Sequence, residues 1–256
     1  MHHRRIKAIL SLFLFTLLVS ACATTSQTAE QNKKKADAAR NLGEAYLSEG
    51  NTTAALGELL RAQELNPDDP ILHNDLGLVY MSKEKIDMAV THFEKAVALK
   101  PDYSLAKNNL GSAYLVQEKW DKAIPVLKEV TGDMLYATPH FPLANLGWAY
   151  YNKKDYAKAA KYLKESLDIQ PEFFTAQLNL GRTYLATGRL HRALGMFETA
   201  AKANPKNPEL LLELGRTYRL MGDYNSARLA LKGAIEYTDN AKLAVEASEE
   251  LKKIYQ

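Results

Sequence analysis

The chain has 256 residues, 46% of them hydrophobic and 25% charged, a composition that excludes a wholly disordered chain. Its formal charge of +3 comes from Arg4, Arg5 and Lys7, because without these three the 33 basic side chains become 30, against 30 acidic ones. Such a balance argues against nucleic acid as a partner, since neutralising a phosphate backbone requires a basic surface.

The first predicted element is a secretory signal in residues 1–21. A basic block, residues 1–7, precedes an apolar run from Ala8 to Val19. This run is too short for a routine bilayer span but suits the apolar region of a signal peptide. We therefore expect a signal and not a transmembrane helix.

The signal ends in Val19-Ser20-Ala21-Cys22, which resembles the bacterial lipobox. The resemblance implies that Cys22, the only cysteine, carries the lipid, with two or more acyl chains needed for stable anchoring. The alternative is a buried structural thiol. Residue 23 is Ala and not Asp, which by resemblance to lipoprotein sorting in Gram-negative bacteria implies the outer membrane, facing the periplasm. Residues 22–35 lack apolar periodicity and are predicted to form the lipidated Cys and a flexible tether.

A Leu-Gly-x-x-Tyr motif recurs six times, at spacings of 34, 34, 36, 34 and 34 residues. The copies begin at Leu42, Leu76, Leu110, Leu146, Leu180 and Leu214. An alanine follows each Leu after thirteen residues, and a large apolar residue lies four further on, such as Ala159 and Leu163. Period and motif resemble the tetratricopeptide repeat, which implies an all-α superhelix, or α-solenoid, of about six helical hairpins.

Within each hairpin, the motif Gly is expected to let the second helix approach closely. Asp69 and Asn207, each before a proline, are predicted N-caps, and Gly50, Gly188 and Gly222 are predicted to end first helices. Leu243, Ala247, Leu251 and Ile254 form the apolar stripe of a C-terminal capping helix, residues 242–256. The predicted repeats are residues 36–69, 70–103, 104–139, 140–173, 174–207 and 208–241, together 36–241.

The repeat family lines a concave groove with first-helix positions that face away from the Leu and Tyr core. We expect these positions to bind another polypeptide, with the aromatic side chains as anchors and the arginines holding a carboxylate. For each residue alone the alternative is local packing or a solvated face. The positions are Asn74, Leu78, Met81, Asn108, Ser112, Leu115, Phe141, Trp148, Tyr151, Arg182, Leu185, Arg216 and Arg219.

The third repeat is two residues longer than the others and joins the fourth through a connection containing Leu135, Tyr136 and Pro139. With the lipobox and six repeats, this Leu-Tyr-x-x-Pro connection resembles the type IV pilus biogenesis lipoproteins (PilF/PilW, the pilotins of the secretin). The resemblance implies an outer-membrane lipoprotein that binds secretin subunits and promotes their localisation and assembly. The alternative for residues 133–139 is a tolerated surface insertion.

Two other functions remain open. One is a lipid-anchored adaptor for peptidoglycan enzymes or outer-membrane protein assembly, and the other is an enzyme. The sequence contains no phosphate-binding loop, nucleophile elbow or Cys/His pair, and no two histidines have the spacing of helical metal ligands. We therefore expect no catalysis, cofactor, metal or small-molecule substrate.

Overall fold

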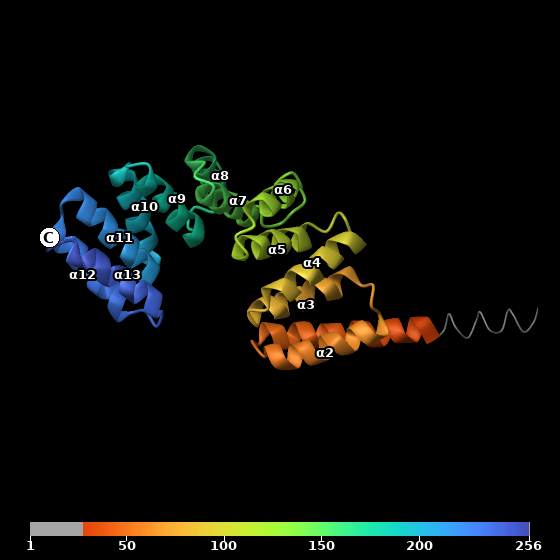
Figure 1. Ribbon diagram of the computed structural model, residues 1–256. Coiled ribbons are helices and arrows are strands. Elements are labelled where there is room, and N and C mark those ends of the chain that lie inside the picture. The colour runs from red at the N-terminus through yellow and green to blue at the C-terminus, as the bar shows by residue number, and fades with distance from the viewer. Residues whose placement is uncertain (1–27, 256) are drawn as a thin grey trace, which may run out of the picture. The chain divides into compact units, whose positions relative to one another are not determined.

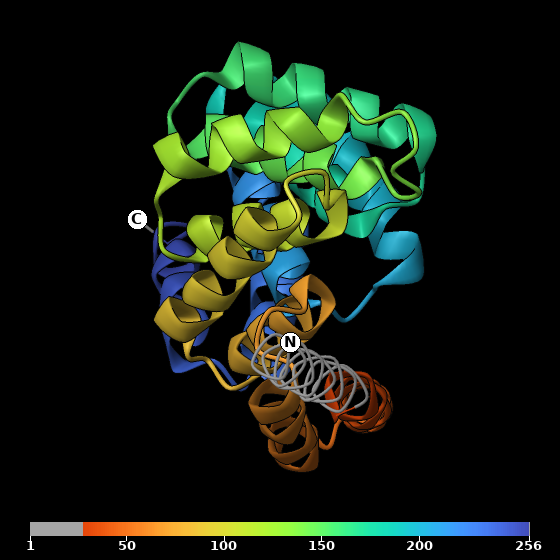
Figure 2. The same ribbon diagram turned by 90° about the vertical axis from the view of Figure 1, so that its right-hand side faces the viewer.

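The computed structural model describes residues 28–255, and within this range every regular element is a helix (Figure 1, Figure 2). The predicted all-α class of six helical hairpins and a capping helix is confirmed. The signal, Cys22 and residues 23–27 lie outside the described residues. The described residues form two compact units, divided between Ala106 and Lys107. Between residues 28 and 255, none of the helices is both apolar enough and long enough for a bilayer crossing.

The first unit contains two hairpins and the start of α5 (Ser104–Val116). The helix of residues 28–48 pairs with α2 (Thr52–Leu65), and α3 (Pro70–Ser82) pairs with α4 (Ile86–Leu99). Residues 28–35, expected in the flexible tether, are instead helical. The buried Ala36 and Ala39 hold the helix that follows, and extending an existing helix costs far less than starting one.

The second unit contains the rest of α5 and eight further helices. These are α6 (Trp120–Thr131), α7 (His140–Asn152), α8 (Tyr156–Ile169), α9 (Phe174–Ala186), α10 (Leu190–Ala203), α11 (Pro208–Met221), α12 (Tyr224–Glu236) and α13 (Ala241–Lys252). Each hairpin packs on the next, and α13 covers the last one through Leu243, Ala247, Leu251 and Ile254. The final hairpin therefore hides its apolar side, as a stack of repeats requires.

The motif glycines allow the two helices of each hairpin to touch. A Cβ atom at Gly147 would lie 2.4 Å from Leu163 Cγ, and one at Gly181 would lie 2.3 Å from Phe197 Cε1. Both distances are far inside van der Waals contact, and Leu163 and Phe197 are fully buried. The repeating Gly is therefore a packing requirement.

The predicted helix ends are confirmed at both kinds of boundary. The Asp69 side chain accepts from the Ile71 backbone N–H, and the Asn207 side chain accepts from that of Leu210. Gly50, Gly188 and Gly222 have φ angles of 78°, 70° and 82°, the left-handed conformation that glycine adopts without strain.

Candidate partner-binding surface

In the second unit the first helices α7, α9 and α11 and the capping helix α13 contribute to one face, which we call the inner face. A pocket of about 380 Å³ opens on it. Its lining includes Trp148, Tyr151, Arg182, Glu213 and Arg216, with further residues from α13, so that all four helices contribute. An adjoining pocket of about 270 Å³ shares Trp148, Arg182 and Glu209 with the first. Together the two pockets form a recess that crosses successive repeats.

The aromatic part of the recess is a stacked pair. The rings of Trp148 and Tyr151 lie 5.2 Å apart, with 10° between their planes, and the Arg182 guanidinium lies 5.8 Å from the Trp148 ring. Burial raises the pKa of Tyr151, so its hydroxyl stays protonated and can donate a hydrogen bond. Flat, partly buried aromatic side chains beside an arginine are typical of binding hot spots.

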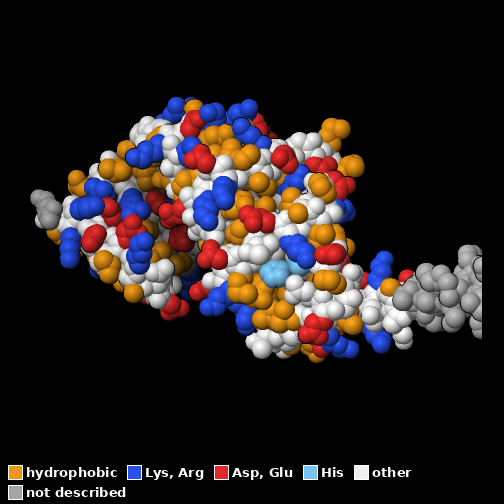
Figure 3. Space-filling view, turned by 45° about the vertical axis from the view of Figure 1, so that its right-hand side comes forward, with side chains coloured by type: hydrophobic (Ala, Val, Ile, Leu, Met, Phe, Trp, Pro, Cys, Tyr) orange, Lys and Arg blue, Asp and Glu red, His pale blue; other side chains and the backbone are white. Residues whose placement is uncertain are grey.

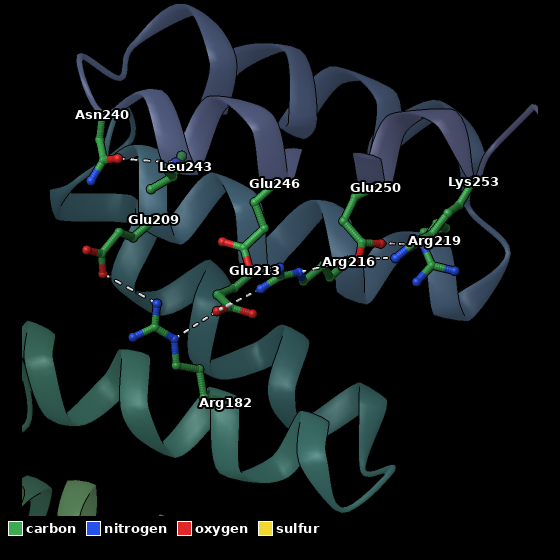
Figure 4. A network of polar contacts seen from close by, with 10 residues as sticks. All are labelled: Arg182, Glu209, Glu213, Arg216, Arg219, Asn240, Leu243, Glu246, Glu250 and Lys253. Atoms are coloured by element: carbon green, nitrogen blue, oxygen red, sulfur yellow. Dashed lines mark hydrogen bonds and ion pairs between the residues drawn. The ribbon is translucent and has the colours of Figure 1, made fainter. Parts of the chain in front are cut away.

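The arginines of the inner face are paired within the unit (Figure 4). Arg182 Nε donates to Glu213 Oε1 at 2.8 Å, and Arg219 Nε donates to Glu250 Oε2 at 2.9 Å. Arg216 Nη2 lies 2.8 Å from Glu246 Oε1. These arginines therefore already pair with glutamates from α11 or α13, which the pattern of groove positions did not predict.

Glu250 closes the network at its C-terminal end. Burial alone would raise its pKa, but the hydrogen bonds and charges of Lys253 and Arg219 outweigh burial and hold the pKa below its usual value. The sequence does contain a signal for this pairing that we missed. Arg182 and Glu213 are 31 residues apart, as are Arg219 and Glu250, which is one repeat less one helical turn.

Glu213→Ala is expected to lower the free energy of unfolding by about 2 kcal/mol, because Glu213 is buried and its removal leaves Arg182 without its closest partner. The matched control is Glu209→Ala. Glu209 is 55% exposed and lies 3.4 Å from the same arginine, so its loss should cost less than about 0.5 kcal/mol. Urea unfolding measures both, and equal costs would contradict the central place of Glu213 in the network.

Other predicted groove residues lie elsewhere. Asn74, Asn108 and Leu115 are buried, so the expectation that they contact a partner is wrong. The Asn74 side chain donates to Asp75, and Asn108 accepts from Asn145, which also donates to Ser112. The two Asn145 hydrogen bonds therefore join α7 to α5, while the Asn74 contact stays within α3. Leu78, Met81 and Leu185 are half-buried, and Phe141 is exposed and packs edge-on against Phe173; none of them lines the two pockets.

The connection between α6 and α7 presents apolar side chains to solvent. Leu135 is 93% exposed and its neighbour Met134 is 97% exposed, while Tyr136 and Pro139 are half-buried. Asp133 Oδ1 accepts from the Leu135 backbone N–H at 2.9 Å, which fixes the turn. Leu135 was predicted from the sequence as part of this connection, and the exposed Met134 was not.

The first unit contains a buried carboxyl group that the sequence pattern did not predict. Asp75 on α3 is 6% exposed, and burial together with a hydrogen bond and the charge of Glu44 raises its pKa to about 7. Its Oδ2 atom has no other hydrogen-bond partner among the described residues. Asp75 takes the position directly before the motif Leu, which Asn occupies in four other copies. This replacement of Asn by Asp is the sequence feature that could have indicated an unusual carboxyl group.

Two histidines of this unit also meet, although 19 residues separate them. His73 Nδ1 and His92 Nδ1 lie 2.9 Å apart, and the His73 Nε2 atom lies 2.9 Å from the Pro67 carbonyl oxygen. Burial, with the charge of His73, lowers the pKa of His92 to about 4. Among residues 28–255 no group of three or more His, Cys, Asp or Glu side chains could hold a metal ion.

Three tetratricopeptide-repeat families match the sequence over successive parts of the chain. One described as "TPR repeat" matches residues 43–83 and 77–117, and two described as "Tetratricopeptide repeat" match 141–173 and 187–247. The chain is a tetratricopeptide-repeat protein. In the structure of this tetratricopeptide-repeat protein, the matched repeats are hairpins that stack on one another and contain the close glycine contacts.

Curated relatives share parts of this tetratricopeptide-repeat chain. The anaphase-promoting complex subunit CDC16 of Saccharomyces cerevisiae is 32% identical over 139 residues, and the photosystem I assembly protein Ycf3 of Prochlorococcus marinus is 34% identical over 79. The matches cover 44% and 30% of this chain, but only 16% of CDC16 and 46% of Ycf3. They therefore identify repeats and not a shared whole-protein activity.

Two solved structures are similar over most of the chain. PilF of Pseudomonas aeruginosa is 23% identical with a TM-score of 0.73, and the comparison covers 86% of this chain and 99% of PilF. PilW, described as a widely conserved type IV pilus biogenesis factor, is 21% identical with a TM-score of 0.75, covering 86% and 98%. The resemblance predicted from the sequence is confirmed at the level of the fold.

Proposed function

We propose that this tetratricopeptide-repeat protein is a binding scaffold in type IV pilus biogenesis. In this proposal the lipid on Cys22 anchors it in the outer membrane, and the repeats bind secretin subunits and promote their localisation and assembly. The fold it shares with PilF and PilW over nearly the whole of both proteins supports this role.

The recess on the inner face carries the proposal. It is open to solvent, extends across successive repeats and combines the Trp148–Tyr151 stack with paired charges. An extended or helical polypeptide segment can place an apolar side chain against these rings while its polar groups exchange with the Arg–Glu network. Because the arginines already have partners, the aromatic pair supplies most of the anchoring.

Removing the aromatic pair tests this proposal. The double variant Trp148→Ala, Tyr151→Ala is expected to reduce the heat-stable secretin multimer in cells by at least about tenfold, since each hot-spot ring contributes on the order of 1–2 kcal/mol. The matched control is Tyr224→Ala, Tyr255→Ala, which removes two tyrosines that are 52% and 67% exposed and line neither pocket. A multimer level that is unchanged in the first variant would count against the recess.

The anchor has its own test. Cys22→Ala is expected to move the protein, and the secretin with it, out of the outer-membrane fraction, because the thiol that would carry the acyl chains is gone. Sucrose-gradient fractionation with antibodies to both proteins measures the change. A variant that stays in the outer-membrane fraction would contradict the lipid anchor. It would not affect the proposal that the recess binds the partner.

A further inference from the structure

A second cleft, of about 630 Å³, lies between α8 and α9. Both helices belong to the second unit, and none of the residues lining the cleft lines the recess of the inner face. The lining residues are Tyr156, Ala157, Ala160, Lys161, Lys164, Thr183, Tyr184, Thr187 and Arg189.

The walls of this α8–α9 cleft are mostly apolar. Ala157 and Ala160 form one side, and the Tyr184 ring lies on the other. The hydroxyls of Thr183 and Thr187 donate to the carbonyl oxygens of Asn179 and Thr183 at 2.7 and 3.0 Å, so neither needs an acceptor in the cleft. Such walls suit carbon-rich side chains.

The charged side chains of the cleft all have one sign. Lys161, Lys164 and Arg189 line it, and no carboxylate does. In the part of the chain that the structure describes, Lys164 and Arg189 form no ion pair, and Lys161 lies 3.9 Å from Glu165 with both side chains well exposed, a pairing of little strength. Arg192 adds a fourth cation, 5.9 Å from the Tyr184 ring.

This charge stands out against the rest of the molecule. The surface drawn in Figure 3 mixes acidic, basic and hydrophobic side chains, and residues 22–256 have equal numbers of acids and bases. On the inner face, Arg182, Arg216 and Arg219 are each paired with a glutamate. The positive charges of Lys164 and Arg189, and of Lys161 with its weak pairing, are therefore available to a ligand.

We propose that the α8–α9 cleft is a second docking site, which takes an acidic, amphipathic segment of a partner protein. The segment's apolar side chains pack against Ala157, Ala160 and Tyr184, while its carboxylates pair with Lys161, Lys164 and Arg189. The side chains of a polypeptide segment can enter a recessed cleft with apolar walls, whereas a flat lipid surface cannot. The site is independent of the recess, so the scaffold can hold two segments at once.

Photocrosslinking in cells tests the site with the full-length protein. The photoreactive residue p-benzoylphenylalanine replaces Ala157, and mass spectrometry identifies the crosslinked peptide. We expect a segment rich in Asp and Glu with apolar residues between them. Reversing all three cations, Lys161→Glu, Lys164→Glu and Arg189→Glu, is expected to reduce the crosslink at least about tenfold, because attraction becomes repulsion.

The matched control reverses three exposed lysines outside the cleft, Lys202→Glu, Lys232→Glu and Lys252→Glu, with the same change in net charge. It should leave the crosslink at Ala157 unchanged, and thermal unfolding of both triple variants should match the wild type. A crosslinked segment that is neutral or basic, a lipid adduct alone, no product, or equal loss in both triple variants would each overturn the proposal. A secretin defect in the Trp148→Ala, Tyr151→Ala variant is measured separately and does not depend on this result.

Discussion

Gly147→Leu is expected to lower the free energy of unfolding by about 3 kcal/mol, the upper part of the range for overpacking a core. A Cβ atom alone would lie 2.4 Å from Leu163 Cγ, and the rest of the leucine side chain has no space between α7 and α8. Because Leu163 is fully buried, it cannot move aside without disturbing the core. Urea unfolding followed by circular dichroism measures the loss.

A second glycine of the same unit provides the control. Gly195 lies inside α10, and a Cβ atom there would meet nothing within 4 Å. Gly195→Ala is therefore expected to stabilise the protein by about 0.5–1 kcal/mol, since alanine favours helix more than glycine does. Gly147→Ala should still destabilise. If Gly147→Ala were as stable as the wild type or more stable, the close packing of the hairpins would be contradicted.

Asp75→Asn is expected to raise the free energy of unfolding at pH 8 by on the order of 3 kcal/mol. Burial and Glu44 raise the pKa of Asp75 to about 7, and each tenfold change in proton affinity corresponds to about 1.4 kcal/mol. Asparagine reproduces the shape and the donor of the protonated carboxyl group without its charge. Chemical denaturation at pH 5 and at pH 8 measures the effect.

The sign follows from proton binding. Between about pH 4 and pH 7 the folded Asp75 keeps a proton that the unfolded one has lost, so stability falls as pH rises through this window and levels off above it. The variant removes this fall, and its advantage should be larger at pH 8 than at pH 5. The pKa of His92 is lowered to about 4, so this residue makes stability rise with pH below about pH 6.5. The contribution is the same in the wild type and in the variant, so it cancels when the two are compared.

Asp102→Asn is the control for this experiment, because Asp102 is an exposed aspartate of the same unit. It should change stability by less than about 0.5 kcal/mol at either pH. Equal gains at pH 5 and pH 8 for Asp75→Asn would show that its effect is not one of ionisation.

The hairpins were predictable from the sequence because each depends on local patterns that repeat. The motif Gly and the apolar residue 17 positions after the motif Leu meet in every hairpin, as Gly181 and Phe197 do. The caps at Asp69 and Asn207 depend on contacts two or three residues away. Signals of this kind do not require knowledge of how the repeats stack.

The details of the surface were harder to predict because they depend on contacts between repeats. Trp148 and Tyr151 were predicted to line the groove and do line the recess of the inner face. The partners of Arg182 and Arg219, however, lie 31 residues further along the chain, on α11 and α13. Likewise, Asn108 occupies a groove position in the pattern, yet Asn145 donates to it from the next first helix and it is buried. The periodicity of one helix does not show which of its polar side chains will form hydrogen bonds or ion pairs with a neighbouring repeat.

The claim that the inner face holds another polypeptide has one direct measurement. With p-benzoylphenylalanine in place of Tyr151, irradiation of intact cells is expected to give a covalent product containing the secretin, and the same residue in place of the exposed Tyr224 is expected to give none. A product that contains a murein hydrolase or a barrel-assembly protein instead of the secretin would indicate an adaptor for those proteins. No protein product from position 151 would contradict the claim itself.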